Sequence, residues 1–338
     1  MDKVINTGLL AYGMSGKVFH APFVSAHQGF NLAAVAERHT KQAASDYPGI
    51  LSYNSPEALL DDDTISLVVI NTPNYTHYDY AKKALLKGKD ILVEKPFTAT
   101  VAEAEELFAL AAAQNKTILF YQNRRWDSDF VFVKEVLASN KLGKLNEITI
   151  RYDRYRAVIG PKSFKEDPVP ASGLLFDLGP HLLDQVISVF GKPLSYTKVL
   201  ANNRKNTQVD DYFHIHLQYE NGLQVYVIAN MLVAGSQPAF VIHGETGSLI
   251  KPRADVQEEQ LLKGIRPGDD EYGVEAAQNI GLLSLVQPDG SIKTEEVTAE
   301  NGNYLQLFDA VYDTLVHLKD YPVSQEQILT QLRIITGL

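Results

Sequence analysis

The chain has 338 residues, of which 45% are hydrophobic and 21% charged, a composition ordinary for a globular protein and long enough for two domains. Its formal net charge of −10 argues against nucleic acid or an anionic membrane as the main partner. There is no cysteine, which excludes disulfides, thiolate zinc sites and cysteine nucleophiles. We expect no signal peptide and no transmembrane helix, and therefore a cytoplasmic protein.

The first third of the chain alternates short apolar runs with helical patterns. Strands are predicted at residues 4–10, 31–36, 65–71, 90–93 and 117–121, and helices at 15–27, 40–47, 55–60, 74–87 and 101–114. Alternation of this kind with short connections predicts a doubly wound parallel sheet, the Rossmann arrangement, over residues 1–122.

After residue 122 the pattern becomes richer in strands. Strands are predicted at residues 145–155, 194–202, 211–219, 223–230 and 239–243, and helices at 128–139 and 304–318. Asn221-Gly222 suits a type I′ hairpin turn. Residues 156–172 read as a loop over a site, and residues 258–272 as a charged, exposed segment. Residues 123–338 are thus predicted to form an α+β domain with a mostly antiparallel open sheet.

The first strand leads into a glycine turn. Ala11-Tyr-Gly13-Met14-Ser15-Gly16 is the dinucleotide fingerprint G-x-G-x-x-G with alanine at its first glycine. Gly13 lets the backbone approach a pyrophosphate, Gly16 allows close packing, and amides at the helix start, including those of Met14 and Ser15, attract the anion. The alternative is a glycine turn of no function, which the flanking strands and helix disfavour.

The second strand is followed by Glu37 and Arg38, which point to different cofactors. An acid here accepts a hydrogen bond from the ribose 2′-hydroxyl of NAD, whereas an arginine pairs with the 2′-phosphate of NADP. The cofactor is predicted to be NAD or NADP, and the balance favours NAD because the Glu37 carboxylate would repel a phosphate.

Two further strands end in polar motifs. Thr72, Pro73, Asn74 and His77 follow residues 65–71, and Glu94-Lys95-Pro96 follows residues 90–93. Open parallel sheets bind ligands at these strand ends, although Thr72 or Asn74 also suits a helix cap. Partial desolvation makes a lysine at such a strand end a usable acid or base.

Asp177, His181 and Asp184 recur at i, i+4 and i+7 within an apolar run, a spacing that places them on one helical face. A histidine beside a carboxylate moves protons near neutral pH. The alternative is a solvated helix face. Pro180 leaves two possibilities: the helix begins near Gly179, or it begins near Gly173 and is bent.

Together these motifs resemble the glucose–fructose oxidoreductase / inositol 2-dehydrogenase (Gfo/Idh/MocA) family. The glycine turn, Glu94-Lys95-Pro96 and Asp177-x-x-x-His181-x-x-Asp184 occur in the family's order, and the resemblance covers the whole chain. Residues 16–22, 123–130 and 152–156 look like the branch with NADP-dependent scyllo-inositol 2-dehydrogenases. NADP-using members of that branch have no acid at the position of Glu37, so the sequence departs there.

The resemblance implies an oxidoreductase that moves a hydride between nicotinamide and a hydroxyl-bearing carbon of scyllo- or myo-inositol or of a sugar. It implies that Lys95 hydrogen-bonds the reacting oxygen and that His181 is the general acid/base. Asp177 would orient His181 or bind a neighbouring hydroxyl, and Asp184 would support them. No metal is expected, because Lys95 would repel a cation. The resemblance also implies a homodimer or homotetramer, because the antiparallel sheet of the second domain often forms the subunit interface in this family.

Four residues carry weaker assignments. Arg125 and Trp126 are candidates for cofactor binding, and Tyr155 and Arg156 for substrate binding. Two other functions stay open at this point. One is a nucleotide-binding regulator without turnover, which would not need Lys95 and His181. The other is a reductase of a different small carbonyl, imine or enone on the same scaffold.

Overall fold

The computed structural model describes residues 3–337, which form two compact units that are each discontinuous in the chain. Unit 1 contains the chain up to Asn123, Gln257–Tyr272 and Asn303–Leu332. Unit 2 contains Arg124–Val256, Gly273–Gly302 and the chain from Arg333 onward. The sequence suggested one boundary, after residue 122. In the structure the chain returns to unit 1 twice beyond that point.

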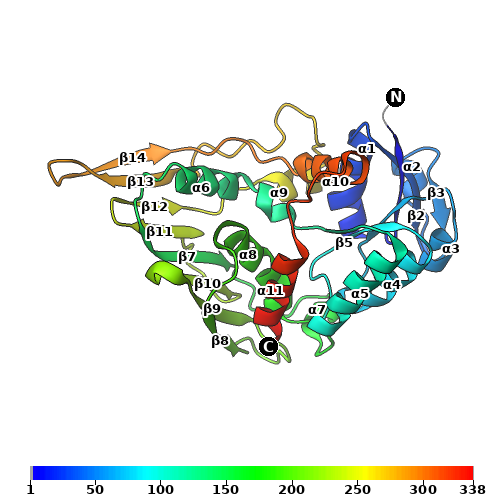
Figure 1. Ribbon diagram of the computed structural model, residues 1–338, viewed down its shortest axis with the longest axis horizontal. Coiled ribbons are helices and arrows are strands. Elements are labelled where there is room, and N and C mark those ends of the chain that lie inside the picture. The colour runs from blue at the N-terminus through cyan, green and yellow to red at the C-terminus, as the bar shows by residue number, and fades with distance from the viewer. Residues whose placement is uncertain (1–2, 338) are drawn as a thin grey trace. The chain divides into compact units, whose positions relative to one another are not determined.

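Unit 1 is built on a six-stranded parallel sheet with the order β3-β2-β1-β4-β5-β6 (Figure 1). The strands are β1 (Ile5–Leu9), β2 (Phe30–Ala36), β3 (Leu51–Tyr53), β4 (Leu67–Ile70), β5 (Asp90–Val93) and β6 (Ile118–Phe120). The predicted doubly wound parallel sheet is confirmed. The prediction missed β3, because a three-residue strand is too short to show a period.

Helices pack on both faces of this sheet. They are η1 (Gly16–His20), α1 (Ala21–Ala26), α2 (Ala43–Asp46), α3 (Pro56–Leu60), η2 (Asn74–Thr76), α4 (His77–Leu86), α5 (Val101–Gln114), α9 (Gln257–Leu262) and α10 (Leu305–His317). α3, α4 and α5 share a core with β4 and β5. α1 stacks on α10 through Phe23 and Phe308, whose ring centroids are 5.3 Å apart. Most of residues 258–272 are exposed, as predicted, whereas Leu261 and Tyr272 are buried because they pack within unit 1.

Unit 2 is built on an eight-stranded sheet with the order β14-β13-β12-β11-β7-β10-β9-β8. The strands are β7 (Leu145–Asp153), β8 (Ser195–Ala201), β9 (Tyr212–Gln218), β10 (Gln224–Asn230), β11 (Phe240–Gly244), β12 (Gly247–Lys251), β13 (Gly281–Val286) and β14 (Ile292–Val297). Among the described strands of this sheet, only β7 and β10 pair in parallel, so the predicted mostly antiparallel sheet is confirmed. Asn221 and Gly222 both have positive φ, 69° and 83°, as the predicted turn between β9 and β10 requires.

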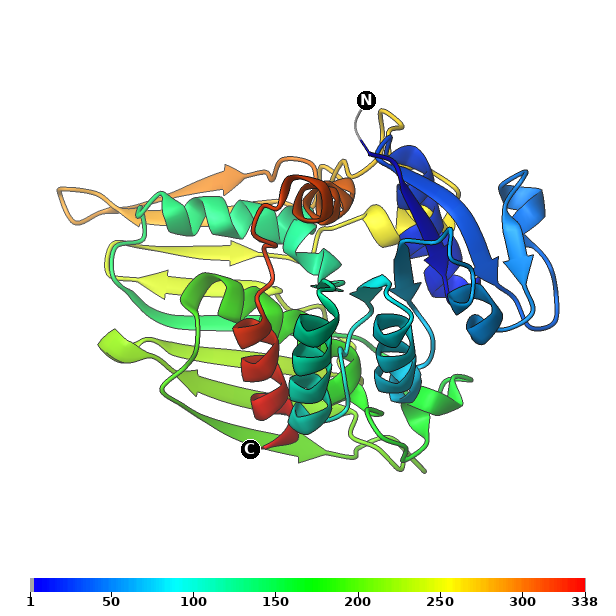
Figure 2. The ribbon, with the colours of Figure 1, turned by 45° about the vertical axis from the view of Figure 1, so that its right-hand side comes forward.

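One face of this sheet is covered by helices. The helical segments are η3 (Asn123–Trp126), α6 (Ser128–Ala138), α7 (Ser163–Glu166), α8 (Leu174–Phe190) and η4 (Glu220–Gly222). A further helix, α11 (Gln325–Thr336), belongs to unit 1 up to Leu332 and to unit 2 from Arg333. α8 lies against β7, β9 and β10, and α6 packs on β11 through Phe130 and Phe240 (Figures 1 and 2). Burial alternates along β9 and β10, with Phe213, Ile215 and Leu217 toward α8. The long helix α8 therefore packs against an apolar face of the sheet.

None of the helices within residues 3–337 is long and apolar enough to cross a membrane.

Candidate active site

The glycine turn between β1 and η1 is closed by the side chain of Asn71. The Ala11 amide donates to Asn71 Oδ1 at 2.9 Å, and Asn71 Nδ2 donates to the Ala11 carbonyl oxygen at 2.8 Å. A Cβ at Gly16 would lie 2.3 Å from that same carbonyl oxygen, so glycine is required there for packing. This two-way hydrogen bond holds the turn although alanine replaces its first glycine.

Gly13 has a different reason to be glycine. It is exposed, its φ is not positive, and a Cβ built on it would meet no atom within 4 Å. Neither packing nor backbone conformation within the protein therefore demands glycine at this position. A ligand that lies against the backbone would demand it, as the pyrophosphate of a dinucleotide does. Together with the exposed neighbour Met14, the turn fits such a cofactor.

Glu94 joins this turn to the lysine motif. Ser15 Oγ donates to Glu94 Oε1 at 2.7 Å, His20 Nε2 lies 2.9 Å from the same oxygen, and the Lys95 amide donates to Glu94 Oε2 at 3.2 Å. Burial opposes ionisation of Glu94, but the His20 and Ser15 contacts and the charge of Lys95 outweigh it and hold its pKa at about 2. Lys95 follows β5, is half-buried, and precedes a cis peptide bond to Pro96.

His77 links the ends of β4 and β5. Its Nδ1 lies 2.8 Å from the Pro96 carbonyl oxygen and its Nε2 lies 2.9 Å from that of Thr72. The ring is fully buried, and burial lowers the pKa of His77 despite these two carbonyl contacts. Pro73 and Asn74, which open η2, are half-buried beside it. His77 therefore connects the loops after β4 and β5, and its predicted contact with a cofactor stays a prediction.

The Glu37 carboxylate is turned into the protein and is only 7% exposed. Its Oε1 accepts hydrogen bonds from the amides of Gln42 and Ala43 at 2.7 and 3.2 Å, and its Oε2 accepts one from Ser52 Oγ at 2.6 Å. Burial raises the pKa of Glu37, but these donors outweigh it and keep the pKa below its ordinary value. The neighbouring Arg38 is exposed, and no ion pair or hydrogen bond of its guanidinium occurs within residues 3–337.

In unit 2, α8 begins before Pro180, which lies inside the helix. Its N-cap, Gly173, has a φ of 88° and no side chain to accept from the first amides. Asp210 takes over this role: its carbonyl oxygen accepts from the Leu174 amide at 2.9 Å and its Oδ2 accepts from the Leu175 amide at 2.6 Å. A Cβ at Gly173 would lie 2.2 Å from Asp210 Oδ1, so this arrangement requires glycine.

Because the helix is continuous, Asp177, His181 and Asp184 do share a face of α8. Each carboxylate has its own cationic partner. Asp184 is buried and accepts from Arg125 Nε and Nη2 at 2.7 and 2.8 Å. Asp177 accepts a hydrogen bond from Lys165 Nζ of α7. His181 lies between these two ion pairs along the helix, four residues after one carboxylate and three before the other.

The remaining candidates on unit 2 are Arg125, Trp126, Tyr155 and Arg156. Arg125 forms the ion pair with Asp184, and its predicted contact with a cofactor stays a prediction. Trp126 ends η3 and is half-buried. Tyr155 forms an isolated bridge with Leu232 and is 64% exposed, and the Arg156 amide donates to the Met231 carbonyl oxygen at 2.7 Å.

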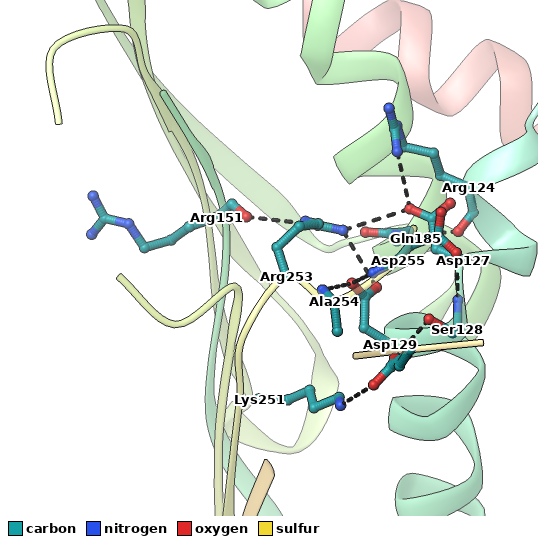
Figure 3. Close-up of polar contacts among 11 residues, drawn as sticks. Arg124, Asp127, Ser128, Asp129, Arg151, Gln185, Lys251, Arg253, Ala254 and Asp255 are labelled. Carbon is teal, nitrogen blue, oxygen red and sulfur yellow. Dashed lines mark hydrogen bonds and ion pairs between the residues drawn. The ribbon is translucent and has the colours of Figure 1, made fainter. Parts of the chain in front are cut away.

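A buried cluster of charged side chains connects residues 124–129 to Arg253 within unit 2 (Figure 3). Arg124 Nη1 donates to Asp127 Oδ2 at 3.2 Å, and Arg253 Nη1 lies 3.7 Å from that oxygen and 3.5 Å from Asp129 Oδ1. Burial and the nearby Asp255 raise the pKa of Asp127 to about 8, despite Arg124. Gln185 Nε2 of α8 donates to the Arg124 carbonyl oxygen at 3.1 Å, which connects the cluster to the helix. No local sequence pattern predicted this cluster, because its members are spread from residue 124 to residue 255.

The candidates thus form two groups. On unit 1, the glycine turn, Glu94, Lys95, Thr72 and His77 are joined by hydrogen bonds at the carboxyl ends of parallel strands. On unit 2, Asp177, His181 and Asp184 share α8 with Lys165 and Arg125 beside them. No group of three or more histidine, aspartate or glutamate side chains able to hold a metal ion occurs in the described part of the chain.

The chain is similar to known oxidoreductases over its whole length. Residues 5–122 match the Gfo/Idh/MocA oxidoreductase family model for the NAD-binding Rossmann fold, and residues 134–338 match the model for its C-terminal alpha/beta domain. The chain is 36% identical to the oxidoreductase YdgJ of Escherichia coli K12, covering 99% of the chain and 95% of YdgJ. It is 32% identical to the scyllo-inositol 2-dehydrogenase (NADP(+)) IolW of Bacillus subtilis, covering 98% of the chain and 92% of IolW.

The fold is also similar to solved structures of oxidoreductases. An oxidoreductase from Bacteroides fragilis is 38% identical and superposes with a TM-score of 0.90, covering 99% of this chain and 96% of that one. The oxidoreductase YvaA from Bacillus subtilis is 31% identical with a TM-score of 0.94, covering 100% of this chain and 95% of that one.

Gly13→Ala tests the ligand-based reason for that glycine. We expect an unchanged thermal unfolding midpoint, because the added methyl meets no protein atom. We expect cofactor affinity to fall by about tenfold or more, equivalent to about 1.4 kcal/mol. Differential scanning fluorimetry and calorimetric titration with NAD and NADP measure the two effects. The matched variant Gly16→Ala should lower stability as well, and equal stability loss in both variants would contradict the assignment.

Asp127 should make the stability of unit 2 fall with rising pH. Its folded pKa of about 8 lies above the ordinary value of 3.8, so its contribution is complete below about pH 4 and is lost as pH rises through 8. Asp127→Asn should remove up to about 1.4 kcal/mol per pH unit of this slope. Denaturant unfolding between pH 5 and 8 measures it, with the exposed Asp289→Asn as control. An identical slope in wild type and Asp127→Asn would count against the raised pKa.

Proposed function

The chain belongs to the Gfo/Idh/MocA family of NAD-binding oxidoreductases, and on this premise we propose that it is a dehydrogenase of CH–OH groups. The proposed substrate is a cyclic polyol such as scyllo- or myo-inositol, or a sugar. The relative IolW, a scyllo-inositol 2-dehydrogenase, supports this substrate class. The chemistry of the two residue groups supports the reaction type.

One observation carries the proposal: the carboxylate of Glu94 accepts hydrogen bonds both from Ser15 in the glycine turn and from the backbone amide of Lys95. The turn is where a dinucleotide would bind, so Lys95 is held at a constant place relative to the cofactor. A lysine in this position can donate a hydrogen bond to the reacting oxygen of a substrate. Its ammonium group then stabilises the negative charge that develops as the hydroxyl group loses its proton.

The reaction requires three events at one alcohol carbon. The glycine turn around Gly13 would hold the dinucleotide, which would supply the hydride acceptor for the C–H bond. An imidazole nitrogen of His181 accepts the hydroxyl proton, and the carbon–oxygen bond becomes a carbonyl. Lys95 Nζ donates a hydrogen bond to that oxygen throughout, and Asp177 orients His181 or binds a neighbouring hydroxyl group. In the reverse direction His181 returns the proton to the oxygen.

We also propose that the cofactor is NADP rather than the NAD favoured by the sequence alone. The reason for expecting NAD was the free carboxylate of Glu37 beside the ribose. In the structure that carboxylate accepts three hydrogen bonds from Gln42, Ala43 and Ser52. Arg38, which is exposed after β2, is then the side chain available for the ribose 2′ substituent, and a guanidinium favours a phosphate.

The homodimeric or homotetrameric state and the cytoplasmic location stay predictions.

A substrate panel tests the main proposal. Myo-inositol, scyllo-inositol and aldoses are supplied with NAD or NADP, and absorbance of the reduced nicotinamide is followed. We expect Lys95→Met and His181→Asn each to lower kcat by about 10²- to 10⁴-fold, because each loses acid–base or charge stabilisation. Cofactor affinity by calorimetry should stay unchanged, and Lys87→Met, an exposed lysine on unit 1, serves as the control. Absence of turnover on every polyol with both cofactors would refute the proposal.

Cofactor preference has its own test, independent of turnover. We expect wild-type protein to bind adenosine 2′,5′-bisphosphate at least about tenfold more tightly than 5′-AMP in calorimetric titrations. Arg38→Ser should remove most of this difference. Glu37→Gln should lower the thermal unfolding midpoint and leave the preference in place, since Glu37 acts as a structural acceptor. Tighter binding of 5′-AMP by the wild type would show that NAD is the cofactor.

A further inference from the structure

Lys165 is a side chain that the sequence did not single out and that the reaction described above does not use. It belongs to the short helix α7, in the segment that was predicted to be a plain loop. Its ammonium group donates to Asp177, and the side chains of the two residues are 30% and 16% exposed. It therefore contacts one of the two carboxylates nearest His181 along α8.

α7 is held in place independently of that contact. The Gly173 amide donates to the Lys165 carbonyl oxygen at 3.1 Å. The next residue, Glu166, accepts from Arg204 Nη2 at 2.7 Å, and buried Arg204 is itself fixed by Asp211, whose Oδ2 accepts from the Arg204 amide at 2.6 Å. Lys165 is thus anchored through its backbone on one side and its neighbour on the other.

The charges around His181 are arranged in pairs. Asp177 and Asp184 lie at −4 and +3 from His181, within reach of its ring on one helix face. Each carboxylate alone would favour the imidazolium form of His181. Arg125 neutralises Asp184, and Lys165 neutralises Asp177. A histidine between two unpaired carboxylates would stay protonated at neutral pH and would be unable to accept a proton.

Other charged groups beside α8 are already engaged. β9 and β10 present apolar side chains to the helix, and Gly179 faces Ile335 of α11. Asp210 accepts from the first amides of α8. Tyr152, at the end of β7, lies among arginine side chains. Among the residues that the structure describes, charged groups near the helix also include Lys134, which interacts with Asp184 and Arg125, and Arg124, Arg154 and Arg253, which surround Tyr152.

We propose that Lys165 is a positioning residue that fixes Asp177 and, by neutralising it, keeps His181 in the unprotonated form that accepts the substrate proton. The consequence for catalysis rests on the proposed function. The electrostatic link from Lys165 through Asp177 to His181 does not.

Titration of His181 by NMR tests this link in the protein without cofactor or substrate. The ring resonance is assigned as the one that disappears in His181→Asn. We expect Lys165→Met to raise the titration midpoint of His181 by about one pH unit, because Asp177 is left without its counter-charge. Lys165→Arg keeps the charge and should restore the wild-type midpoint. Lys293→Met, which removes an exposed ion pair with Glu295 on β14, is the matched control and should change nothing.

Two outcomes would overturn the inference. One is an unchanged His181 midpoint in Lys165→Met. The other is a shift of equal size in Lys165→Arg, which would point to packing rather than charge. Should Lys165→Met fail to fold, Asp177→Asn provides the complementary test: Lys165 is then unpaired and the midpoint must fall.

The pH profile of kcat/KM for polyol oxidation gives the catalytic readout. Its acid limb should move to higher pH in Lys165→Met by the same amount as the NMR midpoint, with kcat affected more than KM. If no polyol is oxidised by the wild type, the proposed function fails while the NMR result still decides the role of Lys165.

Discussion

The ionised carboxylate of Glu94 is the contact on which the arrangement of unit 1 depends. It is half-buried, and it stays charged because Ser15, His20 and the Lys95 backbone all face it. Through it, the turn after β1 and the loop after β5 share one acceptor. His77 likewise connects the loops after β4 and β5. Its two ring nitrogens contact the carbonyl oxygens of Thr72 and Pro96, so these contacts involve neutral carbonyl groups instead of a carboxylate. The candidate cofactor site is therefore a set of loops bonded to one another rather than a set of separate motifs.

In unit 2, the charged side chains on α8 require oppositely charged partners. α8 places two carboxylates and a histidine along one face within a largely apolar helix, where uncompensated charge is costly. Arg125 and Lys165 compensate the carboxylates, and each is supplied by a segment distant in sequence from its partner. The cluster around Asp127 and Arg253 then fixes the segment that carries Arg125. Charge pairing, more than apolar packing, sets the surroundings of His181.

Much of this protein was predictable from local patterns. The parallel sheet followed from short apolar runs alternating with helical periods, and the hairpin followed from Asn221-Gly222. The glycine turn and Lys95 were found because their chemistry depends on residues adjacent in sequence. Prediction failed where strands were short, as in β3, or where both faces carry polar residues, as in β14, whose residues are almost all exposed. Such segments have no period to detect.

The role of individual polar side chains was the least predictable feature. Glu37 occupied the position of a ribose acceptor, yet it accepts hydrogen bonds from Gln42, Ala43 and Ser52. Arg125 suggested cofactor binding, yet it pairs with Asp184. In both cases the side chain has a partner within the protein that competes with a ligand. A sequence does not show that competition, because the partners are brought together only when the chain folds.

The sequence by itself determined the sheet types, the glycine turn, the placement of Lys95 after a buried strand and the spacing of Asp177, His181 and Asp184. These depend on neighbouring residues and on the periods of helix and strand. Only the tertiary structure decided that α8 runs unbroken through Pro180, because Asp210 caps its start from another segment. Only the tertiary structure also shows which polar groups contact each other. Lys165 pairs with Asp177, and Asn71 forms hydrogen bonds with the Ala11 backbone. Both contacts join residues too far apart in sequence for a helix or strand period to predict them.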